Sequence, residues 1–143
     1  MTAEQPSIQD IMCPALLPIL MQYEIDSFVM GHHVYKESWT PFIGEDLGVK
    51  MQADNIVDRY AVAVFTGGEN NVVGHLPLGK SGRFAKTVFY FLKANKENEC
   101  KVVILGKAVN KNDGLGMKVP SRLIFTAEKK FIDILKQTLP KML

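Results

Sequence analysis

Residues 74–81 of this sequence match a pattern that often marks nucleotide chemistry. They read Gly-His-Leu-Pro-Leu-Gly-Lys-Ser and fit the phosphate-loop pattern G-x-x-x-x-G-K-[ST], in which Lys80 would contact a phosphate and Ser81 a magnesium ion. The residues between the glycines are bulky where left-handed torsions are needed, and Pro77 removes one N–H donor. No downstream strand ends in an acidic residue that could hold the magnesium ion. Nucleotide binding is therefore the least favoured hypothesis.

The remaining reactive side chains form no catalytic or metal-binding pattern. His32 and His33 are neighbours, and adjacent residues of a strand point to opposite faces, so they cannot easily share a metal ion. No ligand spacing joins either of them to His75. Ser81 and Cys100 lack the neighbouring base of a nucleophile motif. The sequence therefore predicts a protein that is not an enzyme and that carries no metal ion and no cofactor.

The cysteines and the overall composition predict an intracellular protein of one domain. Cys13 and Cys100 are too few for a zinc site or a disulfide scaffold, and both a single disulfide and two reduced thiols remain open. The first ten residues lack the basic segment of a secretory signal, and no run of eighteen apolar residues could span a membrane. With 143 residues, 47% hydrophobic and 22% charged, the chain has the size and composition of one globular domain.

The charge is distributed unevenly between the two parts of the sequence. Residues 1–79 hold three basic and ten acidic residues, a net charge of −7, whereas residues 80–143 hold fourteen basic and five acidic residues, a net charge of +9. The total of +2 hides this asymmetry. A basic second part favours an anionic partner, although lysines that simply solvate outer faces would give the same pattern.

The pattern of apolar residues predicts a succession of short strands with one central helix. Alternation of apolar and polar residues indicates strands, and the glycine-rich residues 67–71 indicate a hairpin turn. Helical spacing of Phe84, Val88, Phe91 and Leu92, with Ser81 as N-cap, predicts the central helix. The predicted strands are residues 25–34, 46–52, 60–65, 72–77, 99–105 and 118–125.

Both ends of the chain are predicted to extend this body. Ser7 and Asp10 are typical of a helix start, but Pro14 and Pro18 limit the first segment to short helical turns or an extended apolar arm. Near the other end, an amphipathic helix over 127–139 places four apolar residues on one stripe: Phe131, Ile134, Leu135 and Leu139.

About six short strands with glycine-rich turns in a chain of this size favour a small barrel of the OB or SH3 kind, mainly β in class. An open α+β sheet is the alternative. The predicted organisation is an N-terminal apolar or helical arm, a barrel domain with its central helix, and a C-terminal amphipathic helix. These parts comprise residues 1–24, 25–127 and 128–143.

Three short motifs, read together, resemble a known family. They are Gly31-x-x-x-Tyr35, then Asn55-x-x-Asp58-x-x-Ala61-Val62-x-Val64, and finally Val73-Gly74-His75-Leu76-Pro77. Their order and spacing are similar to those of the HIRAN domain, found in fork-remodelling SWI/SNF-type ATPases and as separate modules. The resemblance covers roughly residues 25–127, and the segment with Trp39, Pro41 and Gly44-Glu45 is closest to the animal HIRAN-like proteins.

The resemblance implies an OB-like barrel that recognises the free 3′ end of single-stranded DNA. Asp58 would accept a hydrogen bond from the 3′-hydroxyl, and Tyr35 would offer a surface to the terminal base. His75 and His33 would stand near phosphate, and Asn55 would hold the loop that carries Asp58. An Asx-type turn that caps its own backbone is an alternative role for Asn55 and for Asp58.

The basic second part would then supply the contacts to the DNA backbone. The residues that carry this hypothesis are Lys80, Arg83, Lys86, Lys107, Lys111, Lys118 and Arg122, of which Lys80, Arg83, Lys107, Lys118 and Arg122 are the predicted phosphate contacts. The sequence departs from the family, which has an arginine where this chain has His33 and aromatic residues where it has Val34 and Val57. These departures predict weaker binding of phosphates and bases.

Two hypotheses from different classes therefore stand. The first is a non-enzymatic module that binds single-stranded DNA in the nucleus. The second is a protein-interaction domain that keeps the barrel without the DNA pocket, and docks a protein partner or a second copy through its terminal segments. Neither involves a membrane.

Overall fold

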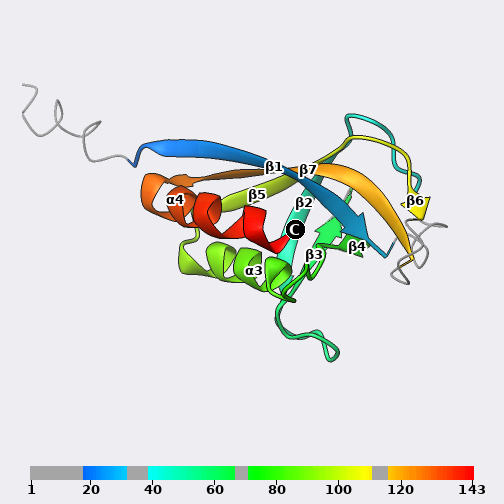
Figure 1. Cartoon of the computed structure of the whole chain (residues 1–143), viewed down its shortest axis with the longest axis horizontal. Coiled ribbons are helices and arrows are strands. Elements are labelled where there is room, and N and C mark those ends of the chain that lie inside the picture. The colour runs from blue at the N-terminus through cyan, green and yellow to red at the C-terminus, as the bar shows by residue number, and fades with distance from the viewer. Residues whose placement is uncertain (1–17, 32–38, 67–70, 111–115) are drawn as a thin grey trace, which may run out of the picture.

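The computed structural model describes residues 18–31, 39–66, 71–110 and 116–143. Within them the chain forms seven strands, two α-helices and a final 3-10 turn (Figure 1). In chain order these are β1 (Leu20–Met30), β2 (Asp46–Gln52), β3 (Ala61–Phe65), β4 (Val72–His75), α3 (Phe84–Ala94), β5 (Glu99–Ile104), β6 (Val109–Asn110), β7 (Met117–Glu128), α4 (Lys129–Thr138) and η1 (Leu139–Met142).

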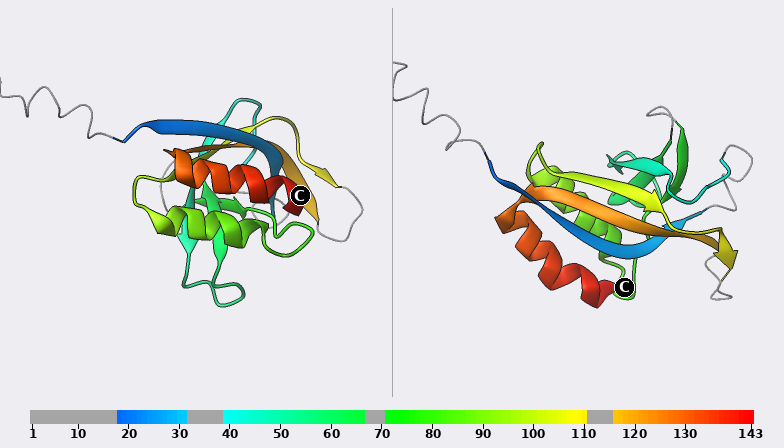
Figure 2. Two further views of the ribbon diagram at one scale, coloured as in Figure 1. Left: turned by 60° about the vertical axis from the view of Figure 1, so that its left-hand side comes forward. Right: turned by 90° about the horizontal axis from the view of Figure 1, so that it is seen from above.

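Six of the strands form a closed antiparallel barrel, which confirms the predicted fold class. The strand order is β1-β4-β3-β2-β5-β7, and pairing of β7 with β1 closes the ring, while β6 pairs with β7 outside it. In Figures 1 and 2, β1 and β7 run side by side as long curved strands across the molecule. Closure leaves none of these six strands with a free edge along its whole length.

The interior of the barrel follows from alternation along its strands. In β7, five alternating residues from Val119 to Ala127 are buried, and the residues between them are partly exposed. Alternate residues of β5, from Cys100 to Ile104, also enter the core. Apolar side chains thus line the inside and polar side chains the outside, as the period of two requires.

In the part of the chain that the structure describes, β1 and β4 meet at one end of the barrel over a single residue pair, Met30 and His75. A Cβ atom at Gly74 would lie 2.4 Å from the Met30 carbonyl oxygen and 2.6 Å from Val29 Cγ1. Only glycine lets the two backbones approach this closely. The glycine of the third motif therefore has a structural role next to His75.

The two α-helices lie side by side on one side of the barrel (Figures 1 and 2). From α3, Phe84, Ala85, Val88, Phe89 and Phe91 are buried. α4 differs from the prediction in one respect, because Ile134 is 56% exposed and the unpredicted Ile132 is fully buried. The buried residues Ile132, Leu135 and Leu139 are spaced i, i+3 and i+7, so the stripe is rotated from the predicted one.

The start of α3 also differs from the prediction. Its N-cap residue is Arg83 and not Ser81, and no side chain caps the helix. Instead the Phe84 and Ala85 amides donate to the carbonyl oxygens of Leu78 and Pro77. The preceding loop, closed by its own backbone, thus replaces the predicted side-chain cap.

The connector before β2 is anchored by a buried pair. Trp39 Nε1 lies 3.1 Å from both carboxylate oxygens of Glu45, and the two residues are 5% and 8% exposed. Glu45 also accepts hydrogen bonds from the Phe42 amide and the Thr66 hydroxyl. A buried carboxylate needs several donors of this kind, and the indole N–H is one of them.

The first strand begins earlier than predicted. β1 starts at Leu20, and the stretch before Ile25 that was assigned to the arm pairs with the end of β7, Leu20 opposite Glu128. Met21 and Tyr23 pack on the core while their neighbours are exposed, so the alternation of a strand extends to this point. The consecutive apolar residues after Pro18 do not alternate with polar ones, so the sequence alone does not indicate a strand there.

Other sequence predictions fall outside the described residues. These are the helix start at Ser7, the turn at 67–70, and Lys111 in the loop before β7. The short strand β6 was not predicted. Cys100 is a free, buried thiol whose pKa burial raises, and Cys13 lies outside the described residues. No helix in the described part of the chain is long and apolar enough to cross a membrane.

Candidate functional site

A pocket of about 320 Å³ lies where the β2–β3 loop, the end of β4 and the start of α3 meet. It brings together three of the residues predicted from the motifs, although they come from two separate segments of the sequence. The lining residues are Asn55, Val57, Asp58, Ala61, His75, Leu76, Leu78 and Ala85. Tyr35 and His33, the other two residues predicted for this pocket, lie outside the described residues.

Asn55 shapes the loop that forms one wall of the pocket. Its Oδ1 atom accepts hydrogen bonds from the amides of Val57 (2.9 Å) and Asp58 (3.0 Å), which is an Asx-type turn. Its Nδ2 atom donates to Gln52 Oε1 over 3.1 Å. Asn55 thus holds the loop that carries Asp58, as expected for either of the roles predicted for it.

Gln52 connects this loop to His75. Because Asn55 Oδ1 faces two backbone donors, its NH₂ group must face Gln52, and the Gln52 atom in contact must be the oxygen. His75 Nε2 lies 2.7 Å from the same oxygen and must therefore donate its proton to it. The network fixes both the orientation and the Nε2–H form of the imidazole.

The electrostatic state of His75 follows from its surroundings. Burial lowers the pKa of His75 below its ordinary value, and the nearby Asp58 carboxylate opposes this lowering. At neutral pH the ring is therefore uncharged and adds no positive charge to the pocket.

Asp58 lines the same pocket, and one of its carboxylate oxygens is already engaged. Its Oδ1 atom accepts a hydrogen bond of 2.9 Å from the Tyr60 amide. Among the described residues, no donor bonds to Oδ2, and the residue lines the pocket. One oxygen thus holds the loop, and the other is available as an acceptor for a ligand hydroxyl.

The five predicted phosphate contacts are not gathered in one place. Lys80 and Arg83 are exposed in the segment between two pocket residues, Leu78 and Ala85. Lys118 is paired with Met30, which is paired with His75, so it lies two strands from His75, roughly 10 Å across the wall. Lys107 lies in the exposed connection between β5 and β6.

Arg122 is the fifth, and acidic residues of β1 engage its charge. Its Nε atom lies 2.8 Å from Asp26 Oδ1 and 3.9 Å from Glu24 Oε1. The hydrogen bond from Arg122 to Asp26 is the main reason that the pKa of this guanidinium is raised. A phosphate contact at Arg122 stays a prediction, and it would compete with this pair.

Two backbone donors of the segment that matches the phosphate loop, and two donors just after it, are engaged. The amides of Leu76 and Lys80 donate to carbonyl oxygens of Val62 and Met142, and those of Phe84 and Ala85 are also bonded to carbonyls. A phosphate-binding loop needs these groups free to face the ligand. The local geometry therefore argues against nucleotide phosphates at residues 74–81.

A second pocket, of about 280 Å³, lies between α3 and α4. Its lining has no acidic or basic residue: Thr87, Tyr90, Phe91, Ala94, Phe131, Ile134 and Leu135. Groups that could hold a metal ion do not cluster anywhere in the described part of the chain. The pocket at Asp58 is thus the one that combines acceptors, donors and nearby cations.

Comparison with solved structures places this architecture in a known group. The crystal structure of the HIRAN domain of human HLTF has a TM-score of 0.61 to this chain at 18% identity, covering 86% of this chain and 92% of that one. The chain has the fold of a HIRAN domain. The predicted resemblance is thereby confirmed at the level of fold.

Two solution NMR structures of the HLTF HIRAN domain agree with this assignment. Each has a TM-score of 0.59 and covers 87% of this chain and 91% of that one, at 18% identity for one and 20% for the other, which was solved in a DNA-bound conformation. No family model and no curated protein sequence matches the chain. The likeness to the HIRAN domain therefore lies in the fold.

The site contains residues that sequence reasoning missed. Gln52 was read as the end of a strand, and it became part of the site because it pairs opposite Ala61 in the β2–β3 hairpin. The motif names neither Arg59 nor Tyr60, which directly follow Asp58. Knowing the register of the β2–β3 hairpin would have identified Gln52 as a neighbour of the loop. That register depends on the length of the loop, which the motif does not give.

Proposed function

We propose that this chain is a nucleic-acid-binding module that holds the 3′ end of a single DNA strand in the pocket at Asp58. Two lines of support come together here. One is the HIRAN-like fold, shared with a domain that has been solved in a DNA-bound conformation. The other is the pocket, which unites the residues of two separate motifs.

The observation that carries the proposal is the state of the Asp58 carboxylate. One oxygen is fixed by the Tyr60 amide, which orients the group, and the other has no donor within the described residues. A terminal hydroxyl is a donor and suits this acceptor, whereas a terminal phosphate brings negative charge and would be repelled. Asp58 would therefore select a strand that ends in a free hydroxyl.

The cations beside the pocket would contact the last phosphates. Lys80 and Arg83 supply positive charge there, whereas the uncharged His75 donates its Nε2–H to Gln52 and lines the pocket. Phosphate contacts position a strand without reading its sequence. The module would thus recognise the end of the strand and not a particular base sequence.

The test is a titration with labelled twelve-nucleotide strands at two salt concentrations. One strand ends in a 3′-hydroxyl, one ends in a 3′-phosphate, and one is circular. The wild-type chain should bind the first at least tenfold more tightly than the others. Asp58→Asn keeps an oxygen for the Tyr60 amide and removes the charge, so it should abolish most of this preference. Lys130→Ala, a change on α4 away from the pocket, serves as the matched control.

Two results would count against the proposal. Equal binding of all three strands that disappears with salt would leave only general electrostatic attraction. A full preference for the hydroxyl in Asp58→Asn would move the end pocket elsewhere. If no strand binds at low salt, the protein-interaction hypothesis, with a protein partner or second copy, becomes the better account of the fold.

A nuclear location belongs to the same proposal, since a module that binds DNA ends must meet DNA. A fluorescent fusion of the whole chain should accumulate in nuclei of animal cells. Exclusion of the fusion from nuclei would argue against a nuclear role while leaving the binding chemistry intact.

A further inference from the structure

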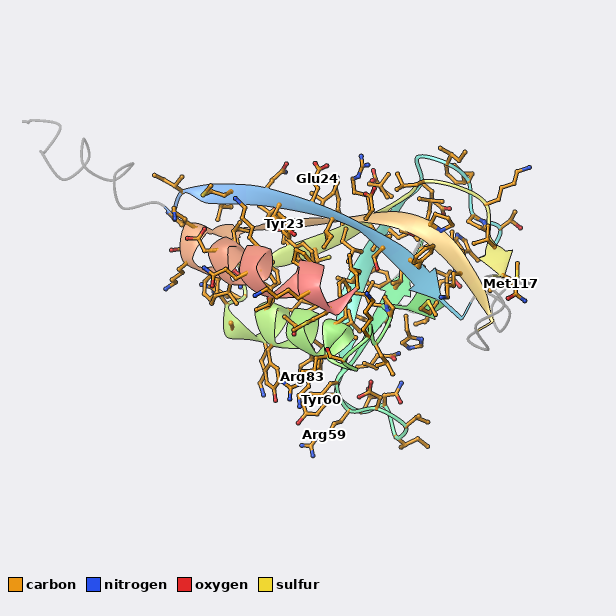
Figure 3. The ribbon with its side chains drawn as sticks, viewed as in Figure 1. Tyr23, Glu24, Arg59, Tyr60, Arg83 and Met117 are labelled. Carbon is orange, nitrogen blue, oxygen red and sulfur yellow. The ribbon has the colours of Figure 1, made fainter. Side chains whose placement is uncertain are left out.

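The exposed side of α3 carries a regular row of basic and aromatic residues. Arg83, Lys86, Tyr90 and Lys93 follow one another at intervals of three, four and three residues, which places them on one helix face. All four are exposed. Figure 3 shows Arg59, Tyr60 and Arg83 on the same side of the molecule, away from Tyr23 and Glu24. The α3 row is defined as these residues together: Arg59, Tyr60, Arg83, Lys86, Tyr90 and Lys93.

The two tyrosines form the fixed centre of the row. The Tyr60 and Tyr90 ring centroids are 5.6 Å apart, and both rings contact the buried Phe89 edge-on, at 5.6 Å and 5.8 Å. The Tyr90 hydroxyl donates a hydrogen bond to the Tyr60 hydroxyl. This bond is the main cause that lowers the pKa of Tyr60, and the positive charge of Arg59 adds to it. Contact with Phe89 anchors a surface feature directly to the core.

Two of the cations contact this centre, and none of the four pairs with an acidic residue in the described part of the chain. Lys86 Nζ lies 4.5 Å from the Tyr60 ring centroid, and Arg59 Cζ lies 5.6 Å from it. Within the described residues, none of Arg59, Arg83, Lys86 and Lys93 has an ion pair, unlike Lys101, Arg122 and Lys129. Four cations without acidic partners on one face create a positive potential, and contact with the rings restricts the motion of two of them.

The row is continuous with the pocket at Asp58. Arg59 follows Asp58 directly, and the pocket residue Ala85 lies between Arg83 and Lys86 on α3. From Arg83 to Lys93 the helix rises about 15 Å. At the spacing of about 3.4 Å per nucleotide in a stacked strand, this length corresponds to roughly four nucleotides.

We infer that the α3 row is a second binding surface for single-stranded DNA, which contacts the phosphates of the nucleotides that precede the end held in the pocket. Charge complementarity identifies this occupant, and the exposed ring of Tyr90 offers a face for one base. The inference rests on the proposed function, because the pocket sets where the strand begins. It adds a path for the strand and predicts a binding-site size.

Because the row contacts the nucleotides that precede the 3′ end, the affinity should depend on strand length. The pocket alone would bind short and long strands with the same affinity. Strands of two, four, six, nine and twelve nucleotides with the same 3′ end are titrated by fluorescence anisotropy in 50 mM salt. For the wild-type chain, affinity should rise at least tenfold from two to six nucleotides and then level off. The double variant Lys86→Glu, Lys93→Glu leaves the cations at the pocket rim in place, so it should remove most of this rise and keep the preference for the 3′-hydroxyl of the shortest strand.

A matched variant on the other helix controls for net charge. Lys130→Glu combined with Lys136→Glu changes the charge by the same amount on exposed residues of α4. This control should keep both the length dependence and its salt dependence. In the double α3 variant, the slope of log affinity against log salt should fall by about 1.4, since each phosphate contact contributes roughly 0.7 for a single strand. Circular dichroism verifies that all variants are folded.

The two proposals fail in different ways. If length dependence persists in the α3 variant, or if the control loses as much, the row is not the binding surface. If the length dependence is present and α3-dependent but 3′-hydroxyl and 3′-phosphate strands bind equally, the pocket proposal fails and the row stands. Equal competition by an acidic peptide of matched charge would show a general anion surface and overturn the inference. Absence of any DNA binding would overturn both.

Discussion

The wall made by β1 and β7 and the side that carries α3 and the pocket are built differently. Among the described residues, β1 and β7 pair at eleven consecutive positions, whereas β1 and β4, next to the pocket, pair only at Met30 and His75. On the β1–β7 wall the exposed Arg122 is matched by Asp26. On the α3 side, Arg83 and Lys86 have no acidic partner among the described residues.

The difference separates stability from binding within one small barrel. A long ladder with matched charges satisfies its own hydrogen bonds and electrostatics, so little is left for a ligand. The pocket side leaves an acceptor, a polarised imidazole and several cations in reach of solvent. Substitutions on the wall should therefore change unfolding, and substitutions on the α3 side should change binding.

The largest expected effect is on the wall. Leu123 on β7 is fully buried, and Leu123→Ala should lower the free energy of unfolding by about 2–5 kcal/mol, because a cavity replaces lost contacts. Urea denaturation followed by the fluorescence of Trp39, the only tryptophan, measures the change. Ile124→Ala, on the outer side of the same strand, should cost clearly less. Equal losses at both positions would contradict the assignment of the barrel interior.

A gain of binding is expected on the pocket side. Val57 lines the pocket and is 92% exposed, so Val57→Tyr adds an aromatic surface without disturbing the core. If a terminal base stacks on it, affinity for single-stranded DNA should rise by about 1–3 kcal/mol, roughly 5- to 150-fold. Ile56→Tyr, on the same loop but outside the pocket lining, is the control. A larger gain from the control would show that the base lies elsewhere.

The pH dependence of folding should also report on the pocket side. Because the pKa of His75 is lower in the folded chain than in the unfolded chain, the unfolded state binds more protons between the two values. The stabilising contribution is complete above the unfolded pKa and is lost as the pH falls toward the folded one. His75→Gln keeps a donor for Gln52. It should reduce the slope of the free energy of unfolding against pH, on the acid side, by the equivalent of at most one proton taken up on unfolding. An unchanged slope in urea titrations between pH 7.5 and 5 would contradict the burial of the ring.

The smallest expected effect concerns the β1–β7 wall. There, in contrast to Leu123→Ala, a substitution should leave the free energy of unfolding level or raise it. Ser27 is 6% exposed, and its Oγ atom has no hydrogen-bond partner among the described residues. Ser27→Ala removes a buried hydroxyl that gained nothing in return, so stability should rise or stay level, within about 1 kcal/mol. Ser121→Ala is the contrasting change, because Ser121 Oγ donates to the Val119 carbonyl and its loss should destabilise. A clear loss of stability in Ser27→Ala would reveal a partner for this hydroxyl.

The sequence predicted those features that depend on local pattern. Alternation and turn residues predicted the strands that form the barrel, and the spacing of two motifs brought Asn55, Asp58 and His75 to one pocket. The motif predicts this loop because the Asn55 side chain bonds to backbone amides only two and three residues further along, so the loop needs an asparagine at that position. These contacts span only a few residues.

Features that depend on tertiary pairing were not predictable. The sequence predicts Arg122 as a phosphate contact and gives no sign of its ion pair, because the partner Asp26 is 96 positions away and meets it only through the register of β1 and β7. The rotated stripe of α4 likewise depends on which face meets α3 and the barrel. The capping of α3 by backbone carbonyls of Leu78 and Pro77 left no sequence signal for its start.

One contact near the end of the chain couples distant parts of the molecule. The Lys80 amide donates to the Met142 carbonyl over 2.8 Å, and a Cβ atom at Gly79 would lie 2.2 Å from the same oxygen. Fraying of η1 would therefore release the loop that borders the pocket. A ligand that orders this loop should slow hydrogen exchange at the Lys80 amide, so that one amide proton reports on the pocket and on the C-terminal turn together.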